Sequence, residues 1–187
     1  MSSDGENILK LFRQARQVCE QVSLLLRTAD EQMLKEGWKS EGNNAISDIS
    51  YSLLNPSQWI PIVAFRFYKH KNYSNRLSYI SVLMCDHFDR RYTIEEPFVT
   101  AGFFDYGIAE VKDDWEYWYA RYYGYLSKDH SLRADGKTFR FDKKMLSTDV
   151  QGKFEKGIIF ALPLTSILNA RDVGLQVTDR LLGLLKE

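Results

Sequence analysis

Three apolar, aromatic segments follow one another in the middle of the chain and are joined by short connections. They are residues 59–68 (WIPIVAFRFY), 77–88 (LSYISVLMCDHF) and 98–106 (FVTAGFFDY). Their β-branched and aromatic side chains are typical of strands. The polar connections between them are too short to hold the crossover helix that a parallel pair requires. The three segments are therefore predicted to form an antiparallel meander.

Helical periodicity marks both ends of the chain. Residues 6–33 carry apolar side chains at three- and four-residue spacing over more than six turns, with polar side chains largely on the opposite side. Residues 169–185 show the same spacing. Both segments are predicted to be amphipathic helices whose apolar sides cover one face of the sheet.

The remaining elements are shorter. Acidic residues open a predicted middle helix over 113–126, because carboxylates favour the positive end of a helix dipole. Residues 138–142 and 157–162 are predicted strands, residues 37–44 a loop, and residues 45–54 a possible short helix.

These elements predict one α+β domain over residues 1–187. In it, an antiparallel sheet of about five strands, the meander plus two later strands, packs against N-terminal, middle and C-terminal helices. The order is α-β-β-β-α-β-β-α. A chain of 187 residues is long enough for one substantial core. Several unrelated superfolds share this outline, so the fold class alone predicts no activity.

The charge composition bears on partners and location. The 25 Lys and Arg residues balance the 25 Asp and Glu residues, so no global field draws the chain to nucleic acid or to an anionic membrane. The first residues lack the pattern of a signal peptide, and no apolar run has the length of a membrane span. We expect a cytoplasmic protein with no membrane partner, in which Cys19 and Cys85 are reduced, buried thiols.

Motifs for phosphates, metals and covalent catalysis are incomplete. Asp135-Gly136-Lys137-Thr138 ends like a phosphate-binding loop, but Ser131 stands where that motif needs glycine and a strand pattern follows, so a turn is predicted. The histidines and cysteines are too scattered for a metal site, and no cofactor is predicted. Cys85 and His87 could pair on one strand face, with Asp89 as the orienting group. The favoured interpretation is a core thiol and a strand-end histidine beside a charged turn, because no oxyanion-hole signature accompanies the pair.

A carboxylate near the end of the second strand segment and a later Glu-x-Lys suggest an enzymatic alternative. Asp86, Glu110 and Lys112, followed by a predicted helix, resemble the active site of PD-(D/E)XK nucleases, whose core runs helix, three strands, helix, strand. The resemblance implies that the two carboxylates hold Mg²⁺ and that the lysine assists the attacking water. In the predicted hairpin, however, Glu110 lies about ten residues beyond the partners of Asp86, roughly 30 Å along an extended strand unless that strand bends.

The middle helix concentrates aromatic side chains beyond what one buried face can hold. Protein interfaces concentrate exposed Tyr and Arg, and the same side chains stack on bases. The alternative is an ordinary core face flanked by amphipathic tyrosines. The candidate binding residues are Trp115, Tyr117, Trp118, Arg121, Tyr122, Tyr123 and Tyr125.

The leading hypothesis is a non-catalytic protein-binding or regulatory module. It engages a protein partner, or a second copy of itself, through the aromatic helix or the terminal helices. The alternatives are the Mg²⁺-dependent nuclease, which would also bind nucleic acid, and a small-molecule sensor suggested by analogy of fold.

Overall fold

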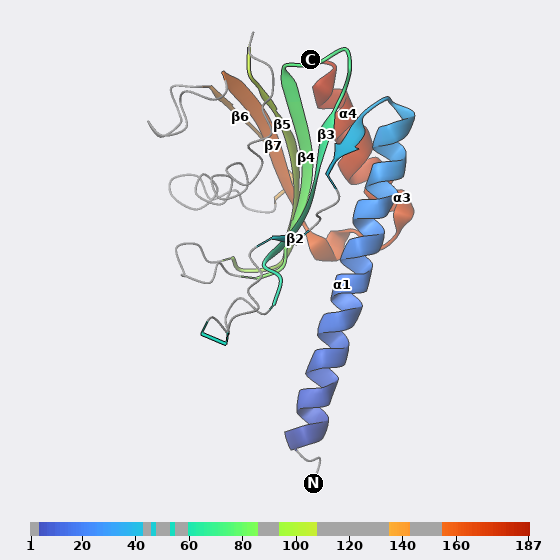
Figure 1. Cartoon of the computed structure of the whole chain (residues 1–187), viewed down its shortest axis with the longest axis vertical. Helices are drawn as coiled ribbons and strands as arrows, with labels where there is room; N and C mark the ends of the chain where they lie inside the picture. Colours follow the sequence, from blue (N-terminus) through green and yellow to red (C-terminus); the bar gives the residue numbers. More distant parts are fainter. Residues whose placement is uncertain are drawn as a thin grey trace.

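The computed structural model describes residues 4–42, 46–47, 53–54, 60–85, 94–107, 135–142 and 155–187 (Figure 1). The first half contributes α1 (Asp4–Lys35), β1 (Lys39–Glu41), β2 (Ile46–Ser47), β3 (Val63–Lys69), β4 (Arg76–Leu83) and β5 (Phe98–Asp105). The second half contributes β6 (Thr138–Asp142), β7 (Lys156–Pro163), the 3₁₀ turn η3 (Leu164–Ser166), α3 (Ala170–Asp172), the π-helical η4 (Val173–Thr178) and α4 (Asp179–Leu185).

The strands form one antiparallel sheet. Its order is β1-β3-β4-β5-β7-β6, and β2 pairs with the start of β3. In the β4–β5 pair Leu83 lies opposite Phe98, and Arg76 lies opposite Asp105. The α+β class and the meander of β3, β4 and β5 are therefore confirmed.

The sheet contains more strands than the sequence predicts. Each of the five predicted segments forms a strand, but β1 and β2 bring the sheet to seven strands within the described ranges. Residues 39–41 were expected in a loop and residues 46–47 in a short helix, and both expectations are wrong. All three β1 residues are exposed, so β1 carries no apolar alternation, and its ladder with β3 holds it in place instead. The predicted middle helix, residues 113–126, lies outside the described residues.

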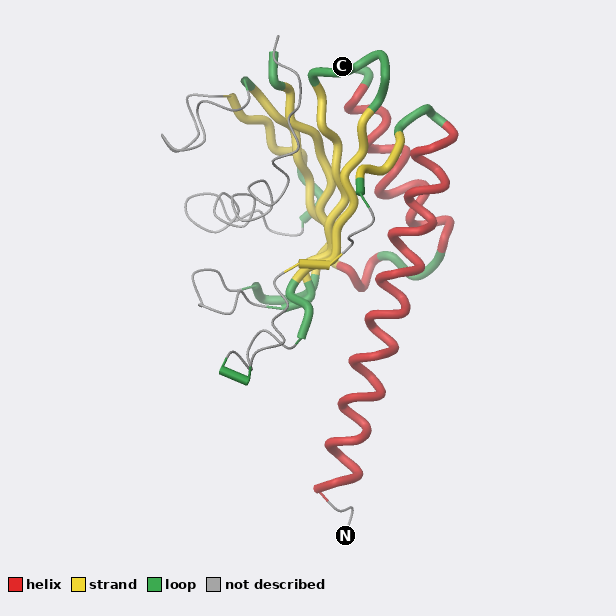
Figure 2. The backbone as a smooth tube through the Cα atoms, viewed as in Figure 1, coloured by secondary structure: helices red, strands yellow, loops and turns green. Residues whose placement is uncertain are grey.

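Both faces of the sheet are buried. Alternation along β3 sends Ala64 and Tyr68 to one face and Phe65 and Phe67 to the other. The first face packs against α1 and the C-terminal helices, which lie together on one side of the sheet in Figures 1 and 2. This confirms that the two terminal helical segments share one face. The second face is aromatic, with the rings of Tyr79 and Phe104 stacked 5.3 Å apart.

The close contact between β5 and β7 depends on a glycine, Gly102, which has no side chain. A Cβ atom added to Gly102 would lie 2.2 Å from the carbonyl oxygen of Ile158, which belongs to the backbone of the neighbouring strand. Because this backbone is fixed by its ladder with β5, a side chain cannot be accommodated by a rotamer change. The glycine sets the spacing at the centre of the sheet.

The C-terminal helices join α1 and the turn before β6. The Thr178 hydroxyl, at the end of η4, donates a hydrogen bond to Gln32 of α1. The Arg180 guanidinium lies 4.0 Å from the centre of the Phe160 ring and donates to the carbonyl of Gly136 and the hydroxyl of Thr138. Gly136 has a φ of 75° and β6 begins two residues later, so the turn predicted at residues 134–137 is confirmed for its described part, residues 135–137.

Helix α1 belongs only partly to this packing. Its buried residues begin at Val22 and continue through Met33, whereas all residues from 4 to 21 are exposed. Figures 1 and 2 show the N-terminal part extending past the end of the sheet. The prediction that this helix covers the sheet is therefore correct for its second half and wrong for its first half. Among the helices of the described ranges, none is long and apolar enough to span a membrane.

Candidate functional site: the exposed arm of helix α1 and the groove at its base

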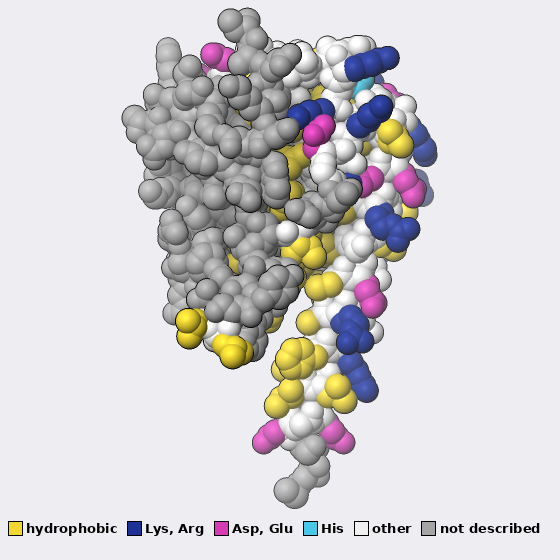
Figure 3. Space-filling view, in the orientation of Figure 1, with side chains coloured by type: hydrophobic (Ala, Val, Ile, Leu, Met, Phe, Trp, Pro, Cys, Tyr) yellow, Lys and Arg dark blue, Asp and Glu magenta, His cyan; other side chains and the backbone are white. Residues whose placement is uncertain are grey.

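The exposed part of α1, residues 4–21, is here called the arm. It is about 27 Å long at the usual rise of about 1.5 Å per residue. Its apolar side chains follow helical spacing and form what we call the stripe: Ile8, Leu11, Phe12, Ala15, Val18 and Cys19. The side chains of Leu11 and Phe12 are 65% and 69% exposed. The space-filling view shows hydrophobic side chains along the arm, on the side toward the domain (Figure 3).

The stripe is the continuation of the face that α1 packs on the sheet. Val22 follows Ala15 by seven residues and Leu26 follows Cys19 by seven, which is two helical turns in each case. Val22 and Leu26 are 3% and 4% exposed. One apolar face therefore runs along the whole helix, and the sheet covers only its C-terminal half.

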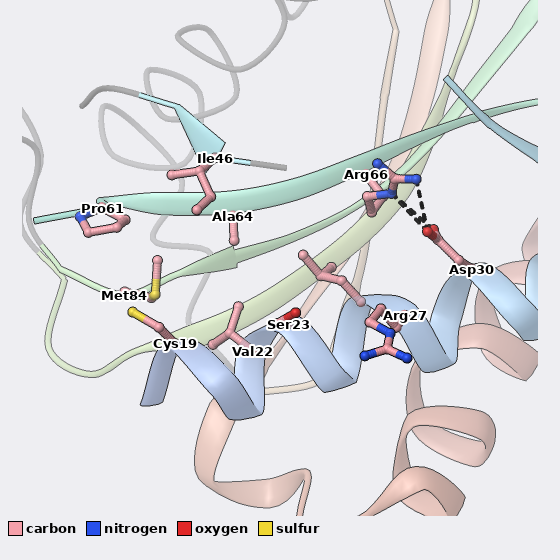
Figure 4. A pocket seen from close by; sticks show the side chains of 11 residues that line it. Cys19, Val22, Ser23, Arg27, Asp30, Ile46, Pro61, Ala64, Arg66 and Met84 are labelled. Atoms are coloured by element: carbon pink, nitrogen blue, oxygen red, sulfur yellow. Dashed lines mark hydrogen bonds and ion pairs between the residues drawn. The ribbon is translucent and has the colours of Figure 1, made fainter. Parts of the chain in front are cut away.

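A groove lies where the arm meets the sheet. It has a volume of about 280 Å³ and lies between α1 and the sheet (Figure 4). Its apolar walls come from Cys19, Val22 and Leu26 on α1 and from Ile46, Ala64 and Met84 on the other side. Figure 4 shows the Cys19 and Met84 side chains pointing toward one another. The stripe thus leads directly into an apolar groove.

An ion pair closes one end of this groove. The Arg66 Nε donates to both carboxylate oxygens of Asp30 at 3.1 and 3.0 Å, and its Nη2 lies 2.9 Å from Asp30 Oδ2. Arg66 also donates to the carbonyl of Gly42, and its side chain is only 13% exposed. Burial, together with the negative charge of Asp30, raises the pKa of the nearby Tyr68 hydroxyl well above its usual value. The pair therefore joins α1 to β3 at this end of the groove.

Cys19 corrects a sequence prediction. Its apolar neighbours predicted a buried thiol, but Cys19 is exposed, because it lies at the mouth of the groove, where the sheet covers it only in part. Cys85 is half-buried, and its Sγ lies 3.7 Å from the carbonyl oxygen of Pro61. His87 and Asp89, its suggested catalytic companions, lie outside the described residues.

Both sets of predicted site residues also lie outside the described residues. These are the nuclease residues Asp86, Glu110 and Lys112, and the aromatic helix residues Trp115, Tyr117, Trp118, Arg121, Tyr122, Tyr123 and Tyr125. The strands that precede them are described, however. Leu83 ends β4 beside Phe98, whereas Asp105 ends β5 at the opposite end of the same ladder, about 23 Å away at the usual rise of a strand.

The acidic residues that the structure describes have structural partners or are dispersed. Asp105 is buried, pairs with Arg76 at 3.3 Å, and accepts hydrogen bonds from the Asn75 side chain and from the Gly107 backbone. In the described ranges, no three His, Cys, Asp or Glu side chains converge as a metal site would require. The candidate site in the described ranges is therefore built from the apolar side chains of the stripe and the groove.

Sequence reasoning identified the apolar periodicity of the arm but assigned it to the core. The length of the helix gave only a partial signal, because the predicted helix is about 42 Å long and the strands predicted to be covered by it are about 30–40 Å long. No protein-family model, no curated protein and no solved structure matches this chain.

Proposed function

We propose that this protein is a non-catalytic protein-binding module that engages a helix of its partner through the α1 stripe and the groove at its base. The observation that carries the proposal is the exposure of Ile8, Leu11 and Phe12, each more than half exposed on one side of a helix. Contiguous apolar surface of this kind on a soluble domain marks an interaction site. An amphipathic helix is covered most simply by another helix, whose side chains fit between its own.

The geometry of the groove supports a protein partner over a small molecule. Its volume of about 280 Å³ is at the lower limit of the range for small-molecule sites, which begins at about 300 Å³. Its walls continue into the stripe, so an occupant that fills the groove also contacts the arm. A helix end with one or two apolar side chains has this shape. The sensor alternative predicts instead a small ligand that raises the melting temperature in a thermal-shift screen.

The test compares one substitution on the stripe with the same substitution away from it. Leu11→Glu places a charge on the stripe, whereas Leu9→Glu places it about 200° away around the helix, at a residue that is 50% exposed. Each full-length variant is immobilised and used to retain proteins from a native lysate, and each is also measured by size-exclusion chromatography with light scattering. We expect wild type and Leu9→Glu to retain a partner, or to self-associate, and Leu11→Glu to do neither.

Two results would contradict the proposal. One is that the wild type, like Leu11→Glu, is a monomer and retains no protein from the lysate. The other is retention of the same proteins by all three forms, since binding would then occur elsewhere. If all three forms retain the same proteins, the proposed binding surface is the aromatic residues of the segment Trp115–Tyr125. The double variant Tyr117→Ala, Tyr123→Ala would test this surface.

The nuclease alternative requires Asp86 and Glu110 to share Mg²⁺. Asp86 follows the end of β4 and Glu110 follows the end of β5, and these strand ends are at opposite ends of one ladder, which favours the binding module. Unchanged DNA cleavage by Glu110→Ala in the presence of Mg²⁺ would eliminate the nuclease. We further propose a cytoplasmic location, which fluorescence microscopy of the tagged chain would test.

A further inference from the structure

The arm offers a surface that is complementary to itself. Its stripe has the heptad spacing of a two-helix interface, with Ile8 and Ala15 at one repeated position and Leu11 and Val18 at the other. The arm carries three basic residues, Lys10, Arg13 and Arg16, and three acidic residues, Asp4, Glu6 and Glu20, so its net charge is zero. Two arms can therefore approach without net repulsion.

Only one relative direction lets two arms cover each other completely. In a parallel pair, the partner helix would continue along the face where Val22, Leu26 and Met33 already contact the core. In an antiparallel pair, residues 4–21 of the two arms lie side by side over their whole length, and the start of each arm lies at the base of the other. The length of the overlap equals the length of the exposed stripe, about 27 Å.

We propose that the partner of the arm is a second copy of this chain, bound antiparallel through the stripe. This inference rests on the proposed function and names its partner. In the register that covers the whole stripe, Ile8 lies opposite the partner's Val18 and Leu11 opposite the partner's Ala15. Phe12 lies beside the partner's Phe12 at the two-fold axis, and Cys19 lies beside the partner's Gly5.

The polar start of each arm lies at the mouth of the groove of the other. The tip of each arm reaches the base of the other, where the groove between Val22, Ile46 and Met84 is open. The arm begins with Asp4 and Glu6, and the wall of the groove includes Arg27, so an acidic helix start approaches a basic side chain. The contact is isologous, because both copies contribute the same arm and the same groove.

The area that becomes buried is sufficient for a dimer. Covering the four large stripe side chains, with Ala15 and Cys19, removes on the order of 500 Å² from each protomer and about 1,000 Å² in total, the size at which specific interfaces begin. The groove adds to this area. A dimer with a moderate dissociation constant is expected, since area alone does not set affinity.

The first measurement is the mass of the purified full-length protein in solution. We expect light scattering to give a dimer for wild type and for Leu9→Glu. We expect Leu11→Glu to raise the dissociation constant by at least about 100-fold, because each dimer contains two copies of the substituted residue. Slow amide exchange in the sheet and over residues 22–35 serves as the control for folding and should be retained in the monomeric variant, since Leu11 is exposed in the single chain. The melting temperature of the variant should be lower than that of the wild type, because association stabilises the folded state.

The second measurement is a disulfide that reports direction. With Cys85→Ser as background, Gly5→Cys places a thiol beside the partner's Cys19 in the antiparallel register. We expect a covalent dimer under oxidising conditions that disappears when Cys19→Ser is added. A covalent dimer that persists without Cys19 would join two Cys residues at position 5, which only a parallel pair permits, and would overturn the arrangement.

The outcomes separate this inference from the proposed function. If the purified wild type is a monomer that retains a different protein from lysate, and Leu11→Glu does not retain it, the homodimer is overturned and the binding module stays intact. A monomer that retains nothing in any form overturns both. A dimer that Leu11→Glu does not weaken overturns the interface.

Discussion

The Asp30–Arg66 pair shows how one interaction connects α1 to the sheet. Arg66 lies on the face of β3 that packs against α1. Its Nε is within hydrogen-bond distance of both carboxylate oxygens of Asp30. The two side chains are 13% and 28% exposed, so solvent screens the pair only in part. Loss of one partner leaves a poorly hydrated charge, which costs more than the pair itself contributes.

We therefore expect Asp30→Asn and Arg66→Met each to lower the free energy of unfolding by about 1.5–3 kcal/mol. The double variant should lose less than the sum of the two, with a coupling of about 1 kcal/mol, because it leaves no unpaired charge. Urea denaturation of the four proteins measures this cycle. Additive losses would show that the two side chains do not interact.

The raised pKa of Tyr68 predicts how the free energy of unfolding depends on pH. Its pKa is raised in the folded protein, first by burial and then by the charge of Asp30, so the folded state keeps the hydroxyl proton longer than the unfolded state does. The stabilising contribution is complete below the unfolded pKa of about 10 and is lost as pH rises above it, by up to about 1.4 kcal/mol per pH unit. Tyr68→Phe should make the free energy of unfolding fall less steeply above that pH. Parallel curves for the two proteins in urea titrations would contradict this expectation.

Two glycines make a matched test of packing in the sheet. Gly102→Ala should lower the free energy of unfolding by about 1–3 kcal/mol or more, since the new methyl group meets the Ile158 backbone. Gly183 is exposed on α4 and has no atom within 4 Å of an added Cβ. Gly183→Ala should raise the free energy of unfolding by about 0.5–1 kcal/mol through helix propensity. If chemical denaturation gave the same change in the free energy of unfolding for both variants, β5 and β7 would be able to move apart without loss of stability.

At the scale of elements, the sequence predicted types better than contacts. The aromatic alternation of β3, β4 and β5 and their short connections were sufficient for the meander, because side-chain period and loop length act locally. β1 could not be predicted, since its exposed residues are held by backbone pairing with a strand more than twenty residues away. The sequence pattern of the stripe did not indicate that it is exposed either. Periodicity identifies an apolar face of a helix, not the surface that covers it, and Cys19 was misassigned for this reason.

The division of α1 at Val22 predicts two rates of amide exchange within one helix. An isolated helix of the arm's length is only marginally stable in water, whereas residues 22–35 are held by the core. In monomeric Leu11→Glu we expect fast exchange over residues 4–21 and slow exchange over residues 22–35. In the wild-type dimer both parts should exchange slowly. Hydrogen–deuterium exchange by mass spectrometry measures this, and fast exchange of the arm in the wild type would show that nothing covers it.

At the scale of the whole molecule, the arm determines the shape of the proposed dimer. Antiparallel arms place the two sheets at opposite ends of a helical pair, and parallel arms would place them side by side. Small-angle X-ray scattering of the wild type should give a distance distribution with two maxima, one from within a domain and one from between domains. A single maximum would indicate a compact assembly and contradict the antiparallel arrangement.

Because residues 4–21 take no part in the core, substitutions there do not draw on the small stability margin of the domain. The residues that hold the sheet and the residues that choose a partner are separate sets on a single helix, divided at Val22. The arm is therefore a ready site for redesign: a new stripe could direct the same domain to a different helix while the fold stays intact.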